Sequence, residues 1–362
     1  MTKIIVSVSN DLSTDQRVEK VCRTLTKNNF EILLIGRKFK NSLPIHRNYK
    51  TKRIKLLFNT GFLFYAEYNF RLFFILLFSK KTLLLANDLD TLLPNFIISK
   101  IKRKKLIYDS HELFSEIPEL VHRKNVKNFW AKLEAFLLPQ IKNSYTVCNS
   151  IATYYNNKYE TDFKVIRNVP LKKEVLEKFV FDFDTNDKKI ILYQGSVNVG
   201  RGLELMIETM PFLPNFLFVI IGTGDIIDDL KQLVSTKNLN SQIHFLGRKS
   251  PKELQKITPL ADIGISTEED LGLNYRYALP NKIFDYIQAE IPILVSNLPE
   301  MKQIVLDYSV GEIIINREPE ELAHQIKKVV NKDFSIKLKE AKEVLIWENE
   351  EQKLIKILKN LK

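Results

Sequence analysis

Residues 275–294 read YRYALPNKIFDYIQAEIPIL and predict a helix followed by a short apolar strand. Pro280 suits the first turn of the helix, because the N–H that proline lacks is not needed there. Lys282 and Asp285 lie three residues apart and therefore share one helix face. A cation and the free N–H groups at a helix start suit a phosphate, and a carboxylate can accept hydrogen bonds from two ribose hydroxyls. The alternative is a surface salt bridge between the two side chains.

The same alternation of helices and apolar strands runs outward from this segment. In the carboxyl-terminal half, strands are expected at 189–193, 216–221, 243–246, 261–265 and 293–295. In the amino-terminal half, they are expected at 4–8, 30–35, 82–86, 105–108, 145–148 and 163–166. Helices fill the intervals, and the first is expected to begin with a capping box from Ser13 to Gln16. Apolar strands in this alternation form parallel sheets with helices on both faces, so the sequence predicts a doubly wound α/β fold.

Length and local composition predict two domains. The 362 residues suit about two domains of ordinary size. The charged segment 171–188 is expected to link a first Rossmann-like domain, 1–170, to a second, 189–345. Residues 346–362 are expected to form a helix that packs back toward the first domain. Ligands of such sheets bind beyond the carboxyl ends of the strands, so site residues are expected in the loops after strands.

Composition excludes several classes of protein. Apolar residues make up 45% of the chain and charged residues 27%, which is typical of a globular protein. Cys22 and Cys148 are far apart, which excludes a disulfide framework and favours a reducing compartment, the cytoplasm. No signal peptide is recognised, and the apolar run within 62–78 is too short for a span of roughly 20 residues. The net charge of +12 suits anionic lipid, a phosphorylated substrate or nucleic acid, or simply a soluble lysine-rich surface.

Three segments place glycine or polar residues directly after expected strands. Residues 193–203 contain Gly195 in a turn between a strand and a helix, which can cradle phosphate. Residues 86–92 and 108–114 carry titratable side chains where the sheet should face a ligand. Each segment has a plainer interpretation, because glycine turns after strands are common and a lone histidine is usually structural.

Segment 275–294 resembles the carboxyl-terminal signature of the family 4 (group 1) retaining glycosyltransferases, Lys-x-Phe-[Glu/Asp]-Tyr-x-x-Ala-x-x-Pro-[Val/Ile]. The resemblance extends over about residues 3–360 and implies the GT-B fold, in which two Rossmann-like domains face each other across a cleft. It implies that Asp285 holds the donor ribose and that Lys282 lies near the donor phosphates. Arg201 stands where the family has a lysine that stabilises the leaving diphosphate.

The resemblance implies further site residues. His111 would approach the donor sugar, in a segment similar to the family's His-[Asp/Glu] pair. The donor-binding residues would be Gly195, Ser196, Thr223, Gly224, Arg248, Tyr277, Asn281 and Asp285. The acceptor-side residues would be Asp15, Arg17, Asp88 and Glu112. Asp15 and Arg17 could equally do no more than charge the first turn of a helix.

The chain also departs from the family pattern. Tyr277 stands where many relatives have the first acid of a Glu-x7-Glu pair, while Glu268 lies nearby but out of register. Gln194 stands where a basic residue is usual. The family's first glutamate contacts the donor sugar, so these departures leave the identity of the sugar open.

The sequence thus predicts a transferase that moves a hexose from a nucleoside-diphosphate sugar to a glycan or lipid-linked acceptor, with retention, in polysaccharide biosynthesis. No cofactor and no metal are expected, since Asp88-Leu89-Asp90 matches the Asp-x-Asp of the other glycosyltransferase fold only in its letters. The alternatives are a nucleotide-sugar epimerase on the same fold and a catalytically silent sugar-nucleotide binder. A dehydrogenase would need Gly-x-Gly-x-x-Gly after the first strand, and nucleic-acid binding would need a recognised motif.

Peripheral binding to the anionic inner face of a membrane is also expected. The segment 62–74 is rich in aromatic residues, and the basic clusters 102–105 and 123–127 belong to the same domain. Apolar insertion combined with basic attraction gives reversible membrane binding. The alternative is that the aromatic side chains fill the core of the first domain.

Overall fold

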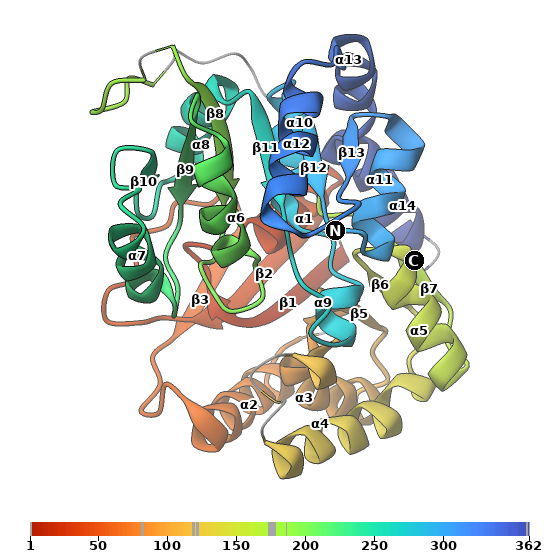
Figure 1. The fold of residues 1–362 in the computed structure, drawn as a ribbon. Coiled ribbons are helices and arrows are strands. Elements are labelled where there is room, and N and C mark those ends of the chain that lie inside the picture. Colours follow the sequence, from red (N-terminus) through yellow and green to blue (C-terminus); the bar gives the residue numbers. More distant parts are fainter. Residues whose placement is uncertain are drawn as a thin grey trace. The chain divides into compact units, whose positions relative to one another are not determined.

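The computed structural model describes residues 2–80, 83–117, 120, 123–172, 179–185, 187–359 and 361. The chain forms two compact units, one made of Met1–Asn168 with Trp347–Lys362 and the other of Val169–Ile346 (Figure 1). Each unit contains one parallel sheet with helices between its strands. The predicted α/β fold with two doubly wound units is therefore confirmed. Residues 173–178 of the expected linker lie outside the described residues.

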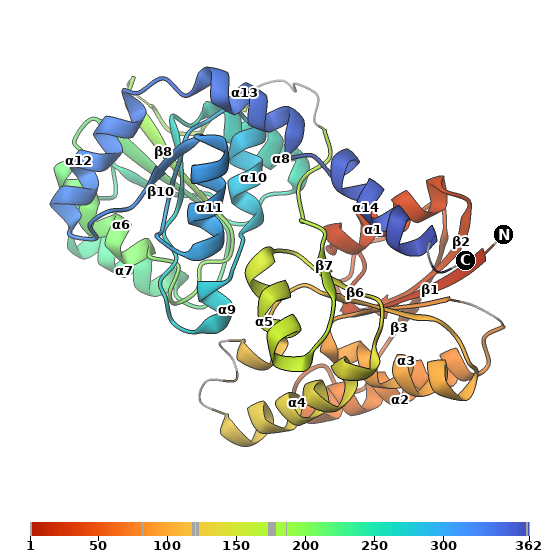
Figure 2. The same ribbon diagram turned by 90° about the vertical axis from the view of Figure 1, so that its right-hand side faces the viewer.

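The first unit is built on a seven-stranded sheet in the order β3-β2-β1-β4-β5-β6-β7, with every neighbouring pair parallel. The strands are β1 (Thr2–Asp11), β2 (Phe30–Arg37), β3 (Lys50–Ile54), β4 (Leu83–Asn87), β5 (Leu106–Ser110), β6 (Ser144–Thr146) and β7 (Phe163–Val165). The helices are α1 (Gln16–Lys27), α2 (Gly61–Leu77), α3 (Leu89–Ile101), α4 (Lys124–Leu137), α5 (Asn149–Tyr159) and α14 (Trp347–Lys359). In Figure 2, α2 and α3 lie on one face of this sheet, and α1 and α14 lie on the other. Because both faces are covered, the central strands β4 and β5 are buried throughout.

Two details of the first unit differ from the sequence prediction. The cap of α1 is Asp15, whose Oδ1 accepts from Val18 N at 3.0 Å, so the predicted Ser13 cap is wrong. Ser13 N instead donates to Asp11 Oδ1 at 3.0 Å, because Ser13 belongs to the turn that follows β1. Strand β3 is not among the predicted strands, since its sequence KTKRI is polar and lies at the sheet edge.

The second unit holds a six-stranded parallel sheet in the order β10-β9-β8-β11-β12-β13. The strands are β8 (Lys189–Gln194), β9 (Phe216–Ile221), β10 (Ile243–Phe245), β11 (Ile263–Ser266), β12 (Ile293–Val295) and β13 (Gly311–Ile313). The helices are α6 (Leu203–Thr209), α7 (Ile227–Thr236), α8 (Pro251–Ile257), α9 (Leu273–Arg276), α10 (Asn281–Gln288), α11 (Pro299–Tyr308), α12 (Pro319–Val330) and α13 (Ser335–Val344). Pro280 is the cap of α10, with φ −64° and ψ 135°, and not a residue of its first turn.

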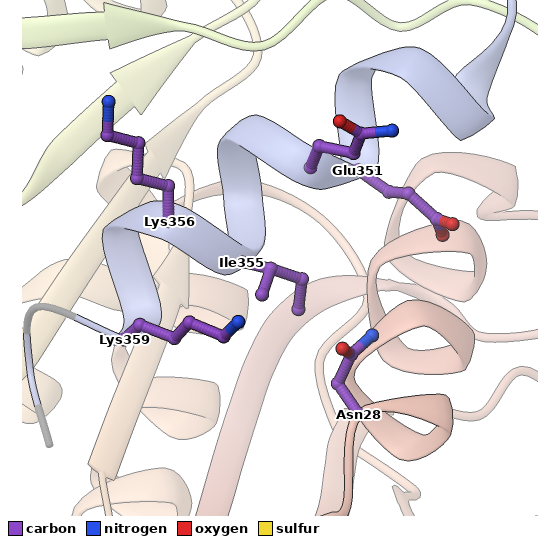
Figure 3. A pocket seen from close by; sticks show the side chains of 6 residues that line it. Asn28, Glu351, Ile355, Lys356 and Lys359 are labelled. Atoms are coloured by element: carbon purple, nitrogen blue, oxygen red, sulfur yellow. The ribbon is translucent and has the colours of Figure 1, made fainter.

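Helix α14 packs against α1 within the first unit. Trp347 Nε1 donates to Thr24 Oγ1 at 2.8 Å, and Thr24 Oγ1 donates to Glu351 Oε2 at 2.6 Å. Leu354 and Leu358 of α14 are buried. Beside them lies a cavity of about 460 Å³ (Figure 3), which is lined by Asn28, Glu351, Gln352, Ile355, Lys356 and Lys359. None of the candidate site residues lines this cavity.

Candidate functional site

In the second unit, the loops after β8 and β9 form two glycine turns that touch each other. Gly195 follows β8 with φ 147°, and Gly222 follows β9 with φ 151°. A Cβ on Gly222 would lie 1.8 Å from the carbonyl oxygen of Gly195, so no larger residue fits there. Ser196 is exposed in the same turn. The backbone is thus accessible beyond the carboxyl end of β8, where phosphate cradles form in such sheets.

Both cations that the resemblance assigns to the diphosphate contact one buried carboxylate. Lys282 in the first turn of α10 has its Nζ 2.7 Å from Glu268 Oε1. Arg201 Nη1 lies 3.6 Å from the same oxygen. Lys282 Nζ also lies 3.9 Å from the ring centroid of Tyr193 and 4.0 Å from the position of a Cβ on Gly195. The structure therefore brings Arg201, Lys282 and the Gly195 turn together.

Asp285 follows Lys282 on α10 and is held to the end of β8. Gln194 Nε2 donates to Asp285 Oδ2 at 3.1 Å, and Gln194 Oε1 accepts from Thr258 Oγ1 at 3.0 Å. The Gln194 amide is thereby fixed from both ends. Gln194, which replaces the basic residue usual in the family, thus orients the carboxylate predicted to hold the ribose.

The other candidate donor-binding residues lie on loops and helix ends of the second unit. Thr223 and Gly224 form the turn after β9, and Arg248 is exposed beyond β10. Tyr277 ends α9, and Asn281 is the first residue of α10. These positions follow the ends of strands or precede a helix, as the sequence predicts. Their contact with a donor stays a prediction.

In the first unit, four charged side chains form a chain at the carboxyl ends of β4 and β5. Arg17 of α1 donates to Asp109 through Nη2 at 2.8 Å and through Nε at 3.1 Å. Asp109 Oδ2 lies 3.2 Å from His111 Nε2, and Asp88 Oδ2 lies 3.1 Å from His111 Nδ1. His111 N also donates to Asp88 Oδ1 at 2.8 Å. The candidates Arg17, His111 and Asp88 are thus brought together through Asp109.

The charges along this chain alternate. Burial disfavours the charged form of His111, but Asp88 and Asp109 outweigh burial and hold its pKa well above the usual range. Burial also disfavours the ionised form of Asp109. Arg17 and His111 outweigh burial and lower the pKa of Asp109 to about 2. These contacts favour the imidazolium form of His111, with Asp88 and Asp109 at its two ring nitrogens.

Arg17 and Asp15 have roles inside the first unit. The Arg17 side chain is only 4% exposed, and it also donates through Nη1 to the carbonyl of Ile166 at 3.2 Å. Asp15 caps α1. Glu112 is half-buried, and its carbonyl accepts from Ser110 Oγ at 2.9 Å. Contact of these residues with an acceptor stays a prediction.

A second buried carboxylate, Asp90, lies beside this chain. The Ser9 hydroxyl donates to Asp90 Oδ2, and Asp90 is 6% exposed. Burial, followed by the nearby charge of Asp88, raises the pKa of Asp90 to about 7. Asp90 thus stays largely protonated in conditions where an ordinary aspartate is ionised.

Sequence reasoning missed three residues that organise these clusters. Asp109 is in a quoted segment but is not selected, and Gln194 is noted only as a departure. Glu268 is set aside because it lies out of register with the family's acidic pair. All three lie at or just after the carboxyl ends of β5, β8 and β11, so the rule that ligands bind at these ends was the available signal.

Within the described ranges, no three or more His, Cys, Asp or Glu side chains gather in a way that could hold a metal ion. In the same part of the chain, no helix combines the length and apolar character needed to cross a membrane.

Comparison with known proteins places these clusters in a family context. Residues 177–344 match the family model of the group 1 glycosyl transferases. A similar protein is an uncharacterised glycosyltransferase of Methanocaldococcus jannaschii, 25% identical over 151 residues, which are 40% of this chain and 37% of that protein. Another is the chitobiosyldiphosphodolichol beta-mannosyltransferase of Kluyveromyces lactis, 24% identical over 246 residues, 58% of this chain and 54% of that protein. The chain thus spans about half the length of these relatives or less.

Solved structures share the fold over the full chain. Sucrose-phosphate synthase of Thermosynechococcus elongatus has a TM-score of 0.81 at 13% identity, and the match covers 100% of this chain and 99% of that one. The Anabaena protein HepE in complex with UDP and glucose has a TM-score of 0.76 at 14% identity, and the match covers 99% and 100%. The chain therefore shares the GT-B fold over its full length, and residues 177–344 of its second unit match the group 1 glycosyl transferases.

Proposed function

We propose that the protein transfers a hexose from a nucleoside-diphosphate sugar to a glycan or lipid-linked acceptor, with retention of configuration. The observation that carries the proposal is the meeting of Arg201, Lys282 and the Gly195 turn beyond the end of β8. Two cations beside an open backbone turn suit a diphosphate. Asp285 on the same helix as Lys282 suits the ribose hydroxyls.

The known ligands of similar proteins support a nucleotide-sugar donor. HepE is described in complex with UDP and glucose, and a trehalose-6-phosphate protein of E. coli with UDP-2-fluoro glucose. UDP is therefore the first nucleotide to test. Glycan assembly is the biosynthetic role that fits a transferase of this family, and it belongs to the proposal.

In the proposed reaction, the bond between the sugar C1 and the diphosphate oxygen breaks, and the acceptor oxygen bonds to C1. Negative charge grows on the leaving diphosphate in the transition state. Arg201 and Lys282 would stabilise this charge without a metal ion, because preorganised cations act strongly in a site shielded from water. His111, held as a cation by Asp88 and Asp109, would offer its remaining exposed edge to the donor sugar.

A thermal-shift panel of nucleotides and nucleotide sugars tests donor binding first. Incubation of a stabilising nucleotide sugar with candidate acceptors should then release the nucleoside diphosphate and form a glycoside, and the anomeric configuration of the product can be read by NMR. The retained anomer and activity that survives chelation by EDTA are expected. An inverted product, or activity lost to EDTA and restored by magnesium, would contradict the finer parts of the proposal.

Two alternatives are separated by the same assay. An epimerase would isomerise the donor and form no glycoside, and the transferase names of the relatives do not favour it. A catalytically silent binder is favoured by one observation, the presence of Tyr277 in place of the first acid of the family pair. It would bind the nucleotide sugar tightly and release no nucleoside diphosphate with any acceptor.

We further propose that the first unit binds the anionic cytoplasmic face of a membrane. One side of α2 is core, with Phe64, Tyr68, Leu72 and Leu76 buried. The other side exposes apolar residues, which are Phe62, Leu63, Phe70, Phe74 and Phe78. The aromatic segment thus serves the core and leaves a second apolar face.

Two neighbouring elements extend this face and give it charge. Helix α4 exposes Phe129 and Phe136, and its Trp130 ring lies 5.0 Å from Tyr65 of α2. Exposed basic residues follow α2 and α3 or begin α4, namely Lys80, Arg103, Lys105, Arg123 and Lys124. Apolar side chains bordered by cations suit an anionic bilayer, at about 1 kcal/mol per basic residue near the surface.

Vesicle co-sedimentation tests the membrane proposal. Binding should require anionic lipid, should fall as salt rises, and should weaken in the double variant Phe70→Ser, Phe74→Ser. Ile315→Ser is a matched control, because Ile315 is an 87% exposed apolar residue of the second unit. Equal recovery in the supernatant with neutral and anionic vesicles at low salt would refute membrane binding and leave the transferase proposal intact.

A further inference from the structure

Glu268 occupies an unusual place for a carboxylate. It lies two residues beyond the end of β11 and is 1% exposed. Ser266 Oγ donates to Glu268 Oε2 at 2.7 Å, while Oε1 faces Lys282 at 2.7 Å and Arg201 at 3.6 Å. Because the carboxylate is buried and contacts two cations, it cannot be treated as an ordinary surface charge.

The two cations have few other ways to be held in place. Lys282 is 7% exposed, and its Nζ lies over the Tyr193 ring at 3.9 Å. The Arg201 guanidinium lies 5.1 Å from the centroid of the Tyr275 ring. A ring face attracts a cation but does not fix its distance as an ion pair does. Glu268 is thus the shared counter-ion of both groups, and one positive charge of the three-residue cluster remains for a ligand.

We propose that Glu268 is a positioning residue, which fixes the charged ends of Lys282 and Arg201 beside the Gly195 turn where the donor diphosphate binds. This inference rests on the proposed function. Glu268 acts on the ligand only through the two cations. Its negative charge holds one side of each cation, and the other side binds the ligand. The family resemblance gives Glu268 no role, since it lies outside the register of the acidic pair.

The charges around Lys282 give the inference a measurable consequence. Burial lowers the pKa of Lys282, Glu268 opposes this, and Arg201 lowers it further. The other titratable groups that face Lys282 are Tyr193, whose pKa burial raises, and Asp285 on its own helix. Glu268→Gln removes the one carboxylate that contacts Lys282, so the pKa of Lys282 falls. Lys282 then loses its proton at a lower pH than in the wild type. Because the charged form binds the diphosphate, that bond is lost at the same lower pH.

Calorimetric titration with UDP, GDP, uridine and guanosine between pH 7.5 and 9.5 tests this consequence. Affinity for a nucleoside diphosphate should fall with rising pH in both proteins as Lys282 loses its proton. In Glu268→Gln this fall should occur at lower pH, so the dissociation constant for the diphosphate should exceed the wild-type value at the same pH by about tenfold or more, while nucleoside binding keeps the same pH dependence in both proteins. Binding by the variant should also take up protons, seen as a dependence of the measured heat on the buffer's ionisation enthalpy.

Glu269→Gln is the matched control, because it removes the same charge one residue away. Glu269 is half-buried, with its side chain 41% exposed, and its Oε1 lies 3.9 Å from Arg317. This variant should keep the wild-type pH profile. A Glu268→Gln variant with the wild-type profile and no proton uptake would overturn the inference and leave the proposed function standing. A wild type that binds neither diphosphate would overturn both.

Glu268→Asp keeps the test decisive if Glu268→Gln does not fold. Aspartate retains the charge but withdraws the carboxylate by about one C–C bond, about 1.5 Å. The pH profile should therefore follow that of the wild type, while diphosphate affinity should fall at least threefold. Wild-type diphosphate affinity in Glu268→Asp would show that the placement of the cations does not depend on Glu268, and would overturn the inference.

Discussion

Asp90→Asn should stabilise the first unit at neutral and alkaline pH. Asp90 is buried, its Oδ2 accepts from Ser9, and its Oδ1 has no hydrogen-bond partner among the described residues. In the folded protein, burial raises the pKa of this carboxyl from 3.8 to about 7. The unfolded chain therefore ionises Asp90 at much lower pH than the folded chain does.

The magnitude follows from proton linkage. Between the two pKa values, the folded state binds more protons than the unfolded state, so the free energy of unfolding falls as pH rises. A shift of about three pKa units amounts to about 4 kcal/mol above pH 7, of which about 2.5 kcal/mol develops between pH 5 and pH 8. Asparagine does not titrate, so the variant lacks this loss. Its buried amide donor costs about 1–3 kcal/mol at every pH, which leaves a net gain of about 1–3 kcal/mol at pH 8.

Tryptophan fluorescence can follow the first unit alone. The chain has two tryptophans, Trp130 and Trp347, and both belong to the first unit. Urea unfolding of wild type and Asp90→Asn at pH 5 and pH 8 therefore gives four free energies for one unit. The difference between variant and wild type should grow by about 2.5 kcal/mol from pH 5 to pH 8, and the constant cost of the amide cancels in that comparison.

The reasoning would be refuted if the two proteins differed by the same amount at both pH values. Equal differences would mean that Asp90 has a pKa near its usual value in the folded state. Some other interaction would then offset the effect of burial on this pKa. A lower stability of the variant at pH 8 than at pH 5, each relative to wild type, would reverse the sign and refute it as well.

Three further predictions concern the ion pairs and the donor site. Arg17→Met should lower the stability of the first unit by about 3–5 kcal/mol, measured by the same fluorescence, because it leaves Asp109 buried without its main partner; an unchanged urea midpoint would contradict it. Asp285→Asn and Lys282→Ala should each weaken donor use about ten- to a hundredfold with the fold intact by circular dichroism, and wild-type KM and kcat in both would mean that the site is misplaced. Arg201→Ala should lower kcat more than it raises KM for the donor, because charge on the diphosphate grows in the transition state; a change in KM alone would argue against this role.

The fold was predictable where a strand is buried on both faces. Strands such as Phe216–Ile221 are continuous apolar runs, and the sequence locates them to the residue. The strands β3 and β13 were not predicted, because their sequences KTKRI and GEI contain no apolar run, whereas the edge strands β7 and β10 were. The start of α1 was misplaced because Asp11 and Asp15 both compete for backbone N–H groups near Ser13, and only the turn geometry decides between them.

The site was predictable in its position and much less so in its partners. The rule on strand ends points to the loops that hold Lys282 and His111, and helical spacing places Asp285 beside Lys282. The contacts of Glu268 with Lys282 and of Asp109 with Arg17 join residues 14 and 92 positions apart, neither of which is a helical or strand spacing. Such pairings depend on loop conformation and sheet order, which spacing in a sequence does not encode.

The return of α14 to the first unit has a consequence for the order of folding during synthesis. The second unit is one continuous stretch, Val169–Ile346, whereas the first unit needs residues from both ends of this chain. The second unit can therefore fold as soon as it leaves the ribosome. The first unit must wait with the surface of α1 uncovered until Trp347, Leu354 and Leu358 have emerged as well. During that interval, its exposed apolar surface is a natural binding site for chaperones.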